Sequence, residues 1–425
     1  MKLDILLGLQ WGDEGKGKVV DVLTQHYDVI ARFQGGPNAG HTLEFNSMKH
    51  VLHIIPSGIF HSDKINIIGN GVVIDPIAFQ KEIEDLENMG FKPTQNLFIS
   101  NKAHLILPTH RWIDAMWEEQ KEKENEKIGS TLKGIGPAYT DKIARTGFRI
   151  CDITTRYFYK KFKSIYQHHT DLLIRNSFKP KEDITTVITE WFLSLQTILR
   201  FKLIDNEYEM NNYLKEGKKV LAEGAQGTLL DIDFGSYPFV TSSNTVAAGA
   251  CTGLGVAPAH TGQVIGIVKA YCTRVGAGPF PTELLDETGN LLRKQGHEFG
   301  STTGRPRRCG WLDLVALKYS IMINGVTEIV LTKADVMDNF DMIKVCTHYK
   351  VGETIINHFP TELNEDIVPV YKDFKGWKQN LSDIKDYEKL PPPFKEYVAF
   401  IERETEIPIR IISTGPDRNQ TIIKT

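Results

Sequence analysis

A glycine-rich segment near the start of the chain has the residue types that hold a phosphate chain. Residues 12–19 read GDEGKGKV and fit the phosphate-loop pattern G-x-x-x-x-G-K-[ST], except that Val19 replaces the final hydroxyl residue. Glycines there let backbone N–H groups approach phosphate oxygens, and the lysine neutralises charge near the transferred group. The missing hydroxyl normally binds Mg²⁺, so another oxygen must replace it, and the carboxylate of Asp13 is the candidate. It could also act on a second substrate; a purely structural glycine loop is the alternative.

A second small-residue segment, GGPNAGHT at 35–42, ends in an imidazole and a hydroxyl. Its small residues permit close approach of the backbone to a ligand. Near a phosphate site, His41 could donate a proton or a hydrogen bond to charge that develops during transfer. A single histidine read alone is more often structural, so this role depends on the glycine-rich setting.

Lys333 and Asp335 directly follow a strand predicted at 328–332 and suit the recognition of guanine. One carboxylate accepts hydrogen bonds from both N1–H and the 2-amino group, which adenine cannot offer, while the lysine stem lies over the base. The late segment STGP at 413–416 could close the other side of a base pocket. These residues favour GTP over ATP, with ordinary exposed polar residues as the alternative.

Residues 300–308 read GSTTGRPRR and place three arginines within four positions. Guanidinium groups match carboxylates and phosphates with paired hydrogen bonds, so this loop predicts a dense anion site. A solvent-facing basic loop or an RNA contact is the alternative.

Two further loops, 130–145 and 223–245, suit a second ligand. Gln226 and Thr241 offer an amide and a hydroxyl that could read a base edge or a phosphate, although ordinary turns also contain such residues.

The elements that must position these residues alternate between strand and helix. Apolar runs predict strands at 3–9, 29–33 and 65–68, and helices at 16–27 and 74–88. This alternation predicts an α/β fold with a largely parallel sheet and crossover helices, whose ligands lie at the carboxyl ends of strands. Between 101 and 218, helical spacing predicts helices at 112–127, 155–176 and 181–201. His168 and His169 lie there without partners at metal spacing and are predicted to be structural or exposed.

Composition excludes several classes of protein. The 425 residues carry a formal net charge of −3, which argues against an extended nucleic-acid-binding surface. The five cysteines are scattered and never in C-x-x-C spacing, so reduced thiols are expected rather than disulfides or a zinc site. No leader and no bilayer-spanning apolar run is evident. A cytoplasmic protein that binds no membrane is therefore expected.

Taken together, these segments resemble the adenylosuccinate synthetase family in an ordered series that runs end to end. The matching segments are 10–18, 35–42, 134–139, 223–226, 301–305, 332–335 and 413–418. The resemblance implies one unit spanning 1–425 that ligates L-aspartate to IMP with GTP, giving adenylosuccinate, GDP and phosphate, the committed step toward AMP. It implies a sheet core at 1–100 and 219–264, a mostly helical insertion at 101–218, and an aspartate-loop and guanine-binding α+β part at 265–425.

The resemblance also implies roles for individual residues. Asp13 removes the proton from N1 of IMP, which makes O6 nucleophilic toward the γ-phosphoryl group, and Gln226 assists by hydrogen-bonding the base. His41 stabilises or protonates the transferring phosphoryl oxygen, while Mg²⁺ bridges Asp13, the Gly40 carbonyl and the phosphates. The product is 6-phosphoryl-IMP, from which the amine of aspartate displaces phosphate. The family implies a homodimer in which Arg145 reaches the neighbour's IMP.

The ligand contacts implied by the resemblance fall into three sets. The expected GTP-binding residues are Gly12, Asp13, Glu14, Gly15, Lys16, Gly17, Lys18, Gly40, His41, Thr42, Arg307, Lys333, Ala334, Asp335, Ser413, Thr414 and Gly415. The expected IMP-binding residues are Asp13, Glu14, Gly15, Lys16, Asn38, Ala39, Gly40, His41, Thr131, Arg145, Gln226, Thr241 and Arg305. The expected aspartate-binding residues are Ser301, Thr302, Thr303, Gly304, Arg305 and Arg307.

Two positions depart from the family pattern. Leu132 stands where the family commonly has glycine, and a side chain makes positive-φ backbone costly. Pro306 interrupts the usual arginine run, which removes an N–H and stiffens the loop.

Two other classes of function are alternatives to the ligase. A regulatory GTPase lacks support because Val19 replaces the Mg²⁺-binding hydroxyl and the arginine loop suits a small dianion, and the modest net charge disfavours an RNA-binding protein.

Overall fold

The computed structural model describes residues 1–425 apart from 46–47, 125, 301–303, 364–365 and 425. Its central element is a ten-stranded sheet in the order β20-β19-β15-β11-β1-β10-β2-β5-β7-β9. Every neighbouring pair is parallel except β19 with β20. The strands are β1 (Leu3–Gly8), β2 (Val29–Arg32), β5 (Ile65–Ile68), β7 (Leu97–Ser100), β9 (Lys202–Ile204), β10 (Val220–Glu223), β11 (Thr261–Lys269), β15 (Glu328–Thr332), β19 (Ile409–Ser413) and β20 (Thr421–Ile423). The predicted α/β fold with a mainly parallel sheet is confirmed.

The central strands are buried along nearly their whole length. In β10 all four residues are buried, and in β1 only Asp4 is partly exposed. Continuous apolar runs of this kind are typical of parallel strands covered on both faces. The helices that accompany the sheet are α1 (Lys16–Thr24), α2 (Pro76–Asn88), α3 (Pro108–Lys123), α4 (Ile135–Ala144), α5 (Phe158–Arg175), α6 (Ile184–Ile198), α7 (Asn206–Lys215), α8 (Ala248–Leu254), α9 (Glu287–Gln295), α10 (Leu314–Asn324) and α11 (Pro392–Thr405).

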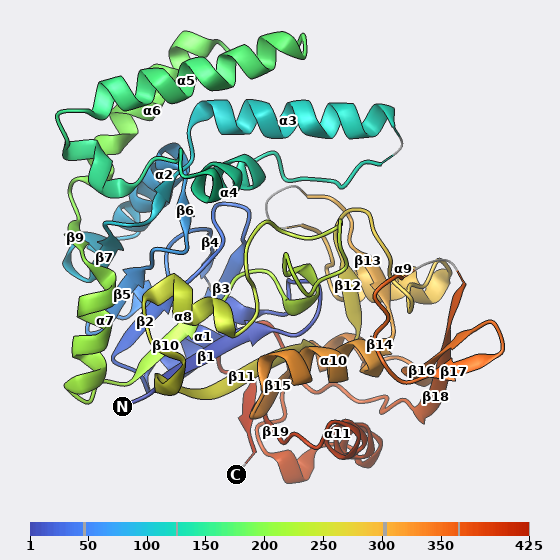
Figure 1. Ribbon diagram of the computed structural model, residues 1–425. Coiled ribbons are helices and arrows are strands. Elements are labelled where there is room, and N and C mark those ends of the chain that lie inside the picture. The colour runs from blue at the N-terminus through green and yellow to red at the C-terminus, as the bar shows by residue number, and fades with distance from the viewer. Residues whose placement is uncertain (46–47, 125, 301–303, 364–365, 425) are drawn as a thin grey trace.

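The five predicted helices are present with shifted ends. The predicted helix 16–27 ends at Thr24, and 74–88 begins at Pro76, because Asp75 caps it by accepting hydrogen bonds from the N–H groups of Ile77 and Ala78. Helices α3, α5 and α6 form a layer of their own above the sheet (Figure 1). The proposed insertion 101–218 contains these helices, but it also contains β9, the edge strand of the main sheet. The division into parts stays a prediction.

Smaller sheets complete the fold. β16 (Met342–Val351) pairs with β14 (Leu312–Asp313), β17 (Thr354–Ile356) and β18 (Ile367–Lys375) beside α10 and α11 (Figure 1). The three remaining sheets are pairs: β3 (His41–Phe45) with β4 (Met48–Leu52), β6 (Val73–Ile74) with β8 (His104–Leu105), and β12 (Cys272–Arg274) with β13 (Arg308–Gly310).

The carboxyl ends of neighbouring central strands bring distant chain segments to one edge of the sheet. The loop 9–15 follows β1, the segment containing Gln226 follows β10, and residues 33–41 follow β2. Lys269 ends β11, and Lys333 follows β15. This is the edge at which open parallel sheets bind ligands, so the topology positions most of the residues singled out in the sequence.

Candidate active site

The phosphate loop is braced from inside by Glu14. Its fully buried carboxylate accepts hydrogen bonds from the N–H groups of Gln10 (3.1 Å) and Gly12 (2.8 Å), and it pairs with Nζ of Lys16 at 2.5 Å. Gly12 and Gly15 both have φ of 87°, which glycine adopts without strain. The side chain of Glu14 therefore shapes the loop, and its carbonyl fixes the loop to β15 by accepting a hydrogen bond from Oγ1 of Thr332 at 2.8 Å.

Lys18 joins the phosphate loop to the late segment 413–420. Its Nζ donates to Oγ of Ser413 (2.7 Å) and to the carbonyls of Gly415 (2.6 Å) and Gln420 (2.9 Å). Burial lowers the pKa of Lys18 to about 8. The sequence motif suggested a lysine near the transferred phosphate, whereas here its ammonium ties two parts of the predicted GTP site together.

The carboxylate of Asp13 lies at the mouth of the loop. Asp13 has φ of 60°, a left-handed conformation that short polar residues tolerate better than most. Its side chain is 31% exposed, and Oδ2 accepts a hydrogen bond from Nε of Arg307 at 2.7 Å. The structure thus brings together the predicted base and the arginine loop across 294 residues of chain.

His41 is held by a buried carboxylate that the sequence analysis did not assign. Nδ1 of His41 lies 2.5 Å from Oε1 of Glu223, the last residue of β10. Glu223 also accepts hydrogen bonds from the N–H (2.8 Å) and Oγ (2.7 Å) of Ser57. Burial, together with the charge of Arg32, lowers the pKa of His41 to about 4. The imidazole is therefore neutral here, with its hydrogen on Nδ1.

Gln226 and His41 both lie against the phosphate loop. A methyl group added to Gly12 would lie 3.5 Å from Cα of Gln226, and one added to Gly35 would lie 3.2 Å from its amide oxygen. A methyl group added to Gly17, in the first turn of α1, would lie 2.9 Å from Cβ of His41. The predicted catalytic residues are thus gathered where the loops after β1, β2 and β10 meet.

Several buried polar atoms in this region have no hydrogen-bond partner among the described residues. They are Nε2 of His41, both amide atoms of Gln226, Oδ1 of Asn38 and the three guanidinium nitrogens of Arg32. Buried polar groups in folded proteins are almost always hydrogen-bonded, and an exception needs an explanation. Polar groups of a ligand would supply the partners of His41, Gln226 and Asn38.

One of the predicted guanine residues, Asp335, lines a cavity of about 550 Å³. Asp335 and Pro416 contribute to its wall, together with residues that the sequence analysis did not single out: Gln295, Val336, Asp338, Asn339, Asn380, Ser382 and Gln420. Burial raises the pKa of Asp335. Lys333 has φ of 61°, and its Nζ donates to the carbonyl of Gly296 at 2.8 Å. The two segments predicted to enclose a base therefore do meet.

The arginine loop is closed at its base. The N–H of Gly300 donates to the carbonyl of Arg305 (2.8 Å), and the N–H of Arg307 donates to the carbonyl of Glu298 (2.9 Å). Gly304 has φ of 65°. The predicted aspartate-binding residues Ser301, Thr302 and Thr303 lie outside the described residues.

Three predicted IMP residues lie on other loops. Thr131 and Thr241 are half-buried, and the loop of Thr241 lies against the first turn of α4, which follows the loop of Thr131, because a methyl group on Gly136 would lie 3.4 Å from Oγ of Ser242. Leu132 does adopt the costly conformation, with φ of 56°; its N–H donates to Oγ of Ser130 at 3.1 Å, which supports the turn. Arg145 lines a separate cavity of about 280 Å³ whose other basic residues are Lys142, Arg149 and Lys161.

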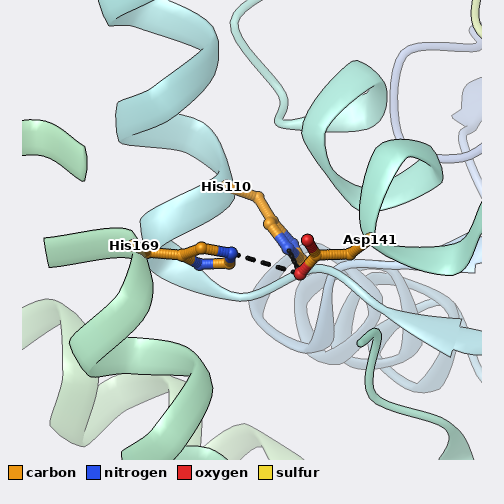
Figure 2. A group of neighbouring side chains, drawn as sticks. All are labelled: His110, Asp141 and His169. Carbon is orange, nitrogen blue, oxygen red and sulfur yellow. Dashed lines mark hydrogen bonds and ion pairs between the residues drawn. The ribbon is translucent and has the colours of Figure 1, made fainter. Parts of the chain in front are cut away.

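A second polar cluster lies in the helical layer (Figure 2). Nε2 of His110 in α3 and Nε2 of His169 in α5 lie 3.0 and 3.1 Å from the same oxygen, Oδ2 of Asp141 in α4. His168 is exposed and His169 is buried, so both histidines fit the prediction made for them. The partners of His169, 28 to 59 residues earlier in the chain, were not foreseen.

This cluster has the residue types of a metal site but the hydrogen bonds of a structural clasp. The N–H of Leu107 donates to Nδ1 of His110 at 3.0 Å, so the ring's own hydrogen lies on Nε2 and points at Asp141. To bind a metal through Nε2, His110 would have to carry its hydrogen on Nδ1 instead. That hydrogen would point at the N–H of Leu107, and the hydrogen bond between them would be lost. Nδ1 of His169 has its own partner, Oγ1 of Thr109, at 2.7 Å. We call His110, Asp141 and His169 the helical clasp.

No helix among the described residues is both long and apolar enough to cross a membrane.

Comparisons with known proteins agree along the whole chain. A family model described as adenylosuccinate synthetase matches residues 5–422. An adenylosuccinate synthetase of Parabacteroides distasonis is 57% identical over 424 residues, covering 100% of this chain and 99% of that protein. One of Flavobacterium johnsoniae is 57% identical over 425 residues, covering 100% of both chains. The solved structure of a fully ligated adenylosuccinate synthetase from Plasmodium falciparum superposes with a TM-score of 0.94 at 39% identity, covering 100% of both chains.

Proposed function

The chain belongs to the adenylosuccinate synthetase family, and from this premise we propose how its own residues carry out the reaction. The enzyme uses GTP to ligate L-aspartate to IMP, giving adenylosuccinate, GDP and phosphate through a 6-phosphoryl-IMP intermediate, a step of AMP biosynthesis. The observation that carries the residue assignments is the set of buried polar atoms of Asn38, His41 and Gln226 that have no hydrogen-bond partner among the described residues, on the segments that follow β2 and β10.

Asp13 is the base that removes the N1 proton of IMP. Its side chain is partly open to solvent, and the backbone of Gln226, whose amide has no partner among the described residues, packs against Gly12, the residue before Asp13. The amide can hydrogen-bond the base while the proton leaves. The electron pair released at N1 makes O6 the nucleophile, the O6–P bond forms, and the bond from the γ-phosphorus to the bridging oxygen of GDP breaks.

His41 stabilises the phosphoryl group in transfer. Because Glu223 accepts the hydrogen of Nδ1, only Nε2 is available to the ligand, and it donates only when the ring is protonated. Phosphate oxygens next to Nε2 favour the charged ring and raise its pKa from the resting value of about 4. The incoming nucleotide thus creates the donor that it needs.

Arg307 changes partner during the cycle. In the structure its Nε donates a hydrogen bond to the carboxylate of Asp13, the proposed base. Carboxylates of the substrate aspartate, or phosphate oxygens of GTP, are anions that a guanidinium group binds as it binds the carboxylate of Asp13. Such an anion takes the place of Asp13 at Nε of Arg307 and leaves Asp13 to act on IMP. Arg305, on the same loop, completes the anion site, and Asp335 and Lys333 hold the guanine base.

The residues present fit a magnesium ion. The carboxylate of Asp13 and the carbonyl of Gly40 are hard oxygen donors, and Mg²⁺ typically combines one or two carboxylates with substrate phosphates. When bound, the ion supplies neutralisation of the phosphate charge. Because Val19 has no hydroxyl to bind the ion, the carboxylate of Asp13 would take the place of that ligand.

We also propose a cytoplasmic homodimer. Arg145 lies at the carboxyl end of α4, in a strongly basic cavity separate from Asp13. This placement suits a residue that serves the phosphate of a neighbouring subunit's IMP rather than its own.

An omission assay tests the proposed function. GTP consumption should require both IMP and aspartate, and ¹⁸O placed at O6 of IMP should appear in inorganic phosphate. GTP hydrolysis indifferent to IMP would instead indicate a regulatory GTPase. Label that remains in the purine would contradict transfer to O6.

A further inference from the structure

Glu298, which no motif singles out, is the point at which three basic side chains meet. Its carboxylate is fully buried, and Oε2 accepts a hydrogen bond from Nη1 of Arg307 at 2.6 Å. Oε1 accepts one from Nζ of Lys269 at 3.0 Å and one from the hydroxyl of Tyr271. Nζ of Lys333 lies 3.9 Å from Oε1.

These partners come from different parts of the active site. Lys269 ends β11, and Lys333 follows β15 beside the guanine cavity. Arg307 belongs to the arginine loop and contacts Asp13. A single carboxylate therefore contacts Arg307, proposed to hold aspartate, and lies 3.9 Å from Lys333, proposed to hold guanine. Through Arg307 it is also linked to Asp13, the proposed base.

The charge of Glu298 is maintained by this surrounding. Burial alone would raise its pKa, but Lys269, Lys333 and Arg307 hold the pKa of Glu298 at about 2. Lys269 is buried as well, and its other hydrogen bond goes to Oγ1 of Thr273 at 2.7 Å. Removing a partner from a buried charge pair is costly because the remaining charge stays uncompensated. Glu298 is thus ionised throughout the neutral range and keeps its partners in place.

Arg307 has two distinct attachments. Nη1 is bound by Glu298, which is completely buried, while Nε is bound by Asp13, whose side chain is 31% exposed. The backbone of Arg307 is also fixed to Glu298, through the hydrogen bond from its N–H to the Glu298 carbonyl. A ligand anion can therefore replace Asp13 at Nε without releasing the guanidinium from Glu298.

We propose that Glu298 is a positioning residue, which holds Arg307 at one nitrogen while its other contact passes from Asp13 to the substrate aspartate. This inference rests on the proposed function, because it assumes that Arg307 binds aspartate. Glu298 itself touches no substrate and acts through Arg307, with Lys269 as its fixed counter-ion.

The test is Glu298→Gln in the full-length enzyme. Glutamine has one acceptor oxygen, so either Arg307 or Lys269 faces an NH₂ group instead of a carboxylate oxygen. The KM for aspartate should rise about ten- to hundredfold, as expected for losing a hydrogen bond between charged groups. The KM for IMP should stay within about twofold of the wild-type value. A merely structural role would instead lower the melting temperature and leave the aspartate KM unchanged.

Glu283→Gln is the matched control. Glu283 accepts a hydrogen bond from Nε of Arg308, the residue after Arg307, at 2.8 Å. Its loss should leave the aspartate KM unchanged. If Glu298→Gln fails to fold, the double variant Lys269→Met/Glu298→Gln removes both charges of the buried pair, and it should show the same aspartate defect.

The outcomes separate this inference from the proposed function. A wild-type enzyme that consumes GTP without IMP and aspartate contradicts the proposed function. A wild type that requires both, with an unchanged aspartate KM in a folded Glu298 variant, overturns only the positioning role.

Discussion

Two buried regions of the molecule each pair imidazole with carboxylate, yet their hydrogen bonding differs. In the helical clasp, both ring nitrogens of His110 and of His169 have protein partners. Beside the phosphate loop, His41 uses one nitrogen on Glu223 and leaves the other buried and unpartnered among the described residues. The first arrangement is complete within the chain, and the second requires a ligand to complete it. Residue types alone do not distinguish the two.

The largest effect that this comparison predicts is at Asp13. Asp13→Asn keeps the size of the side chain but cannot take the N1 proton, so kcat should fall by at least about a thousandfold, toward the upper range for loss of a general base. GTP affinity should change far less. Steady-state turnover and nucleotide titration of the same preparation measure both. Near-normal turnover would remove Asp13 from the role of base.

The second prediction concerns the open nitrogen of His41. His41→Asn should lower kcat about a hundredfold, because a proton donor at the phosphoryl group is lost. In the wild type, turnover should fall as pH rises through the pKa of His41 in the substrate complex, since only the protonated ring donates from Nε2. That pKa lies above the resting value of about 4.

The His41→Asn variant should lack this fall of turnover at higher pH, the basic limb of the pH profile. Measuring kcat of both enzymes across the neutral pH range would show the difference. The same limb in the wild type and in His41→Asn would assign the titration to another group.

The success of the sequence analysis has the same physical basis as its omissions. The phosphate loop and the Lys333–Asp335 pair are local, because their spacing along the chain directly sets their geometry after a strand. The pairing of His41 with Glu223 spans 182 residues and that of Arg307 with Asp13 spans 294. Such contacts exist only once parallel strands bring their carboxyl ends together, so no local pattern could reveal them.

Leu132 shows a subtler limit. Its left-handed backbone was expected to be costly, and the structure adopts it nevertheless, with Ser130 supporting the turn through its side chain. Propensity gives the cost of a conformation, but neighbouring hydrogen bonds determine whether the fold accepts it. The position of the loop that contains Leu132 was therefore predictable from the sequence, and its backbone conformation was not.

A smaller effect is expected in the clasp, on stability rather than turnover. His110→Gln should lower the free energy of unfolding by about 1–3 kcal/mol, because Leu107 N–H and Asp141 lose buried partners. Burial lowers the pKa of His110 below its ordinary 6.5. The native state therefore binds fewer protons than the unfolded state, so this contribution is complete above pH 6.5 and declines as pH falls.

Denaturant unfolding at several pH values measures this effect. The variant should lose part of the wild type's acid sensitivity while retaining its kcat. An unchanged stability at neutral pH would contradict the assignment of the clasp as a structural element.

The smallest expected effect is that of zinc on the clasp, and it separates the two regions most directly. If the clasp bound Zn²⁺ in the native state alone, an excess of about a hundred times the dissociation constant would stabilise the fold by about 2.7 kcal/mol. The hydrogen bond from Leu107 to Nδ1 of His110 opposes that binding, because Nε2 already carries the hydrogen. The melting temperature should therefore be the same with micromolar zinc and with a chelator, and the His110→Gln variant should respond as the wild type does. A zinc-dependent rise in the wild type that the variant lacks would mean that the imidazole changes tautomer, and the clasp would then be a metal site.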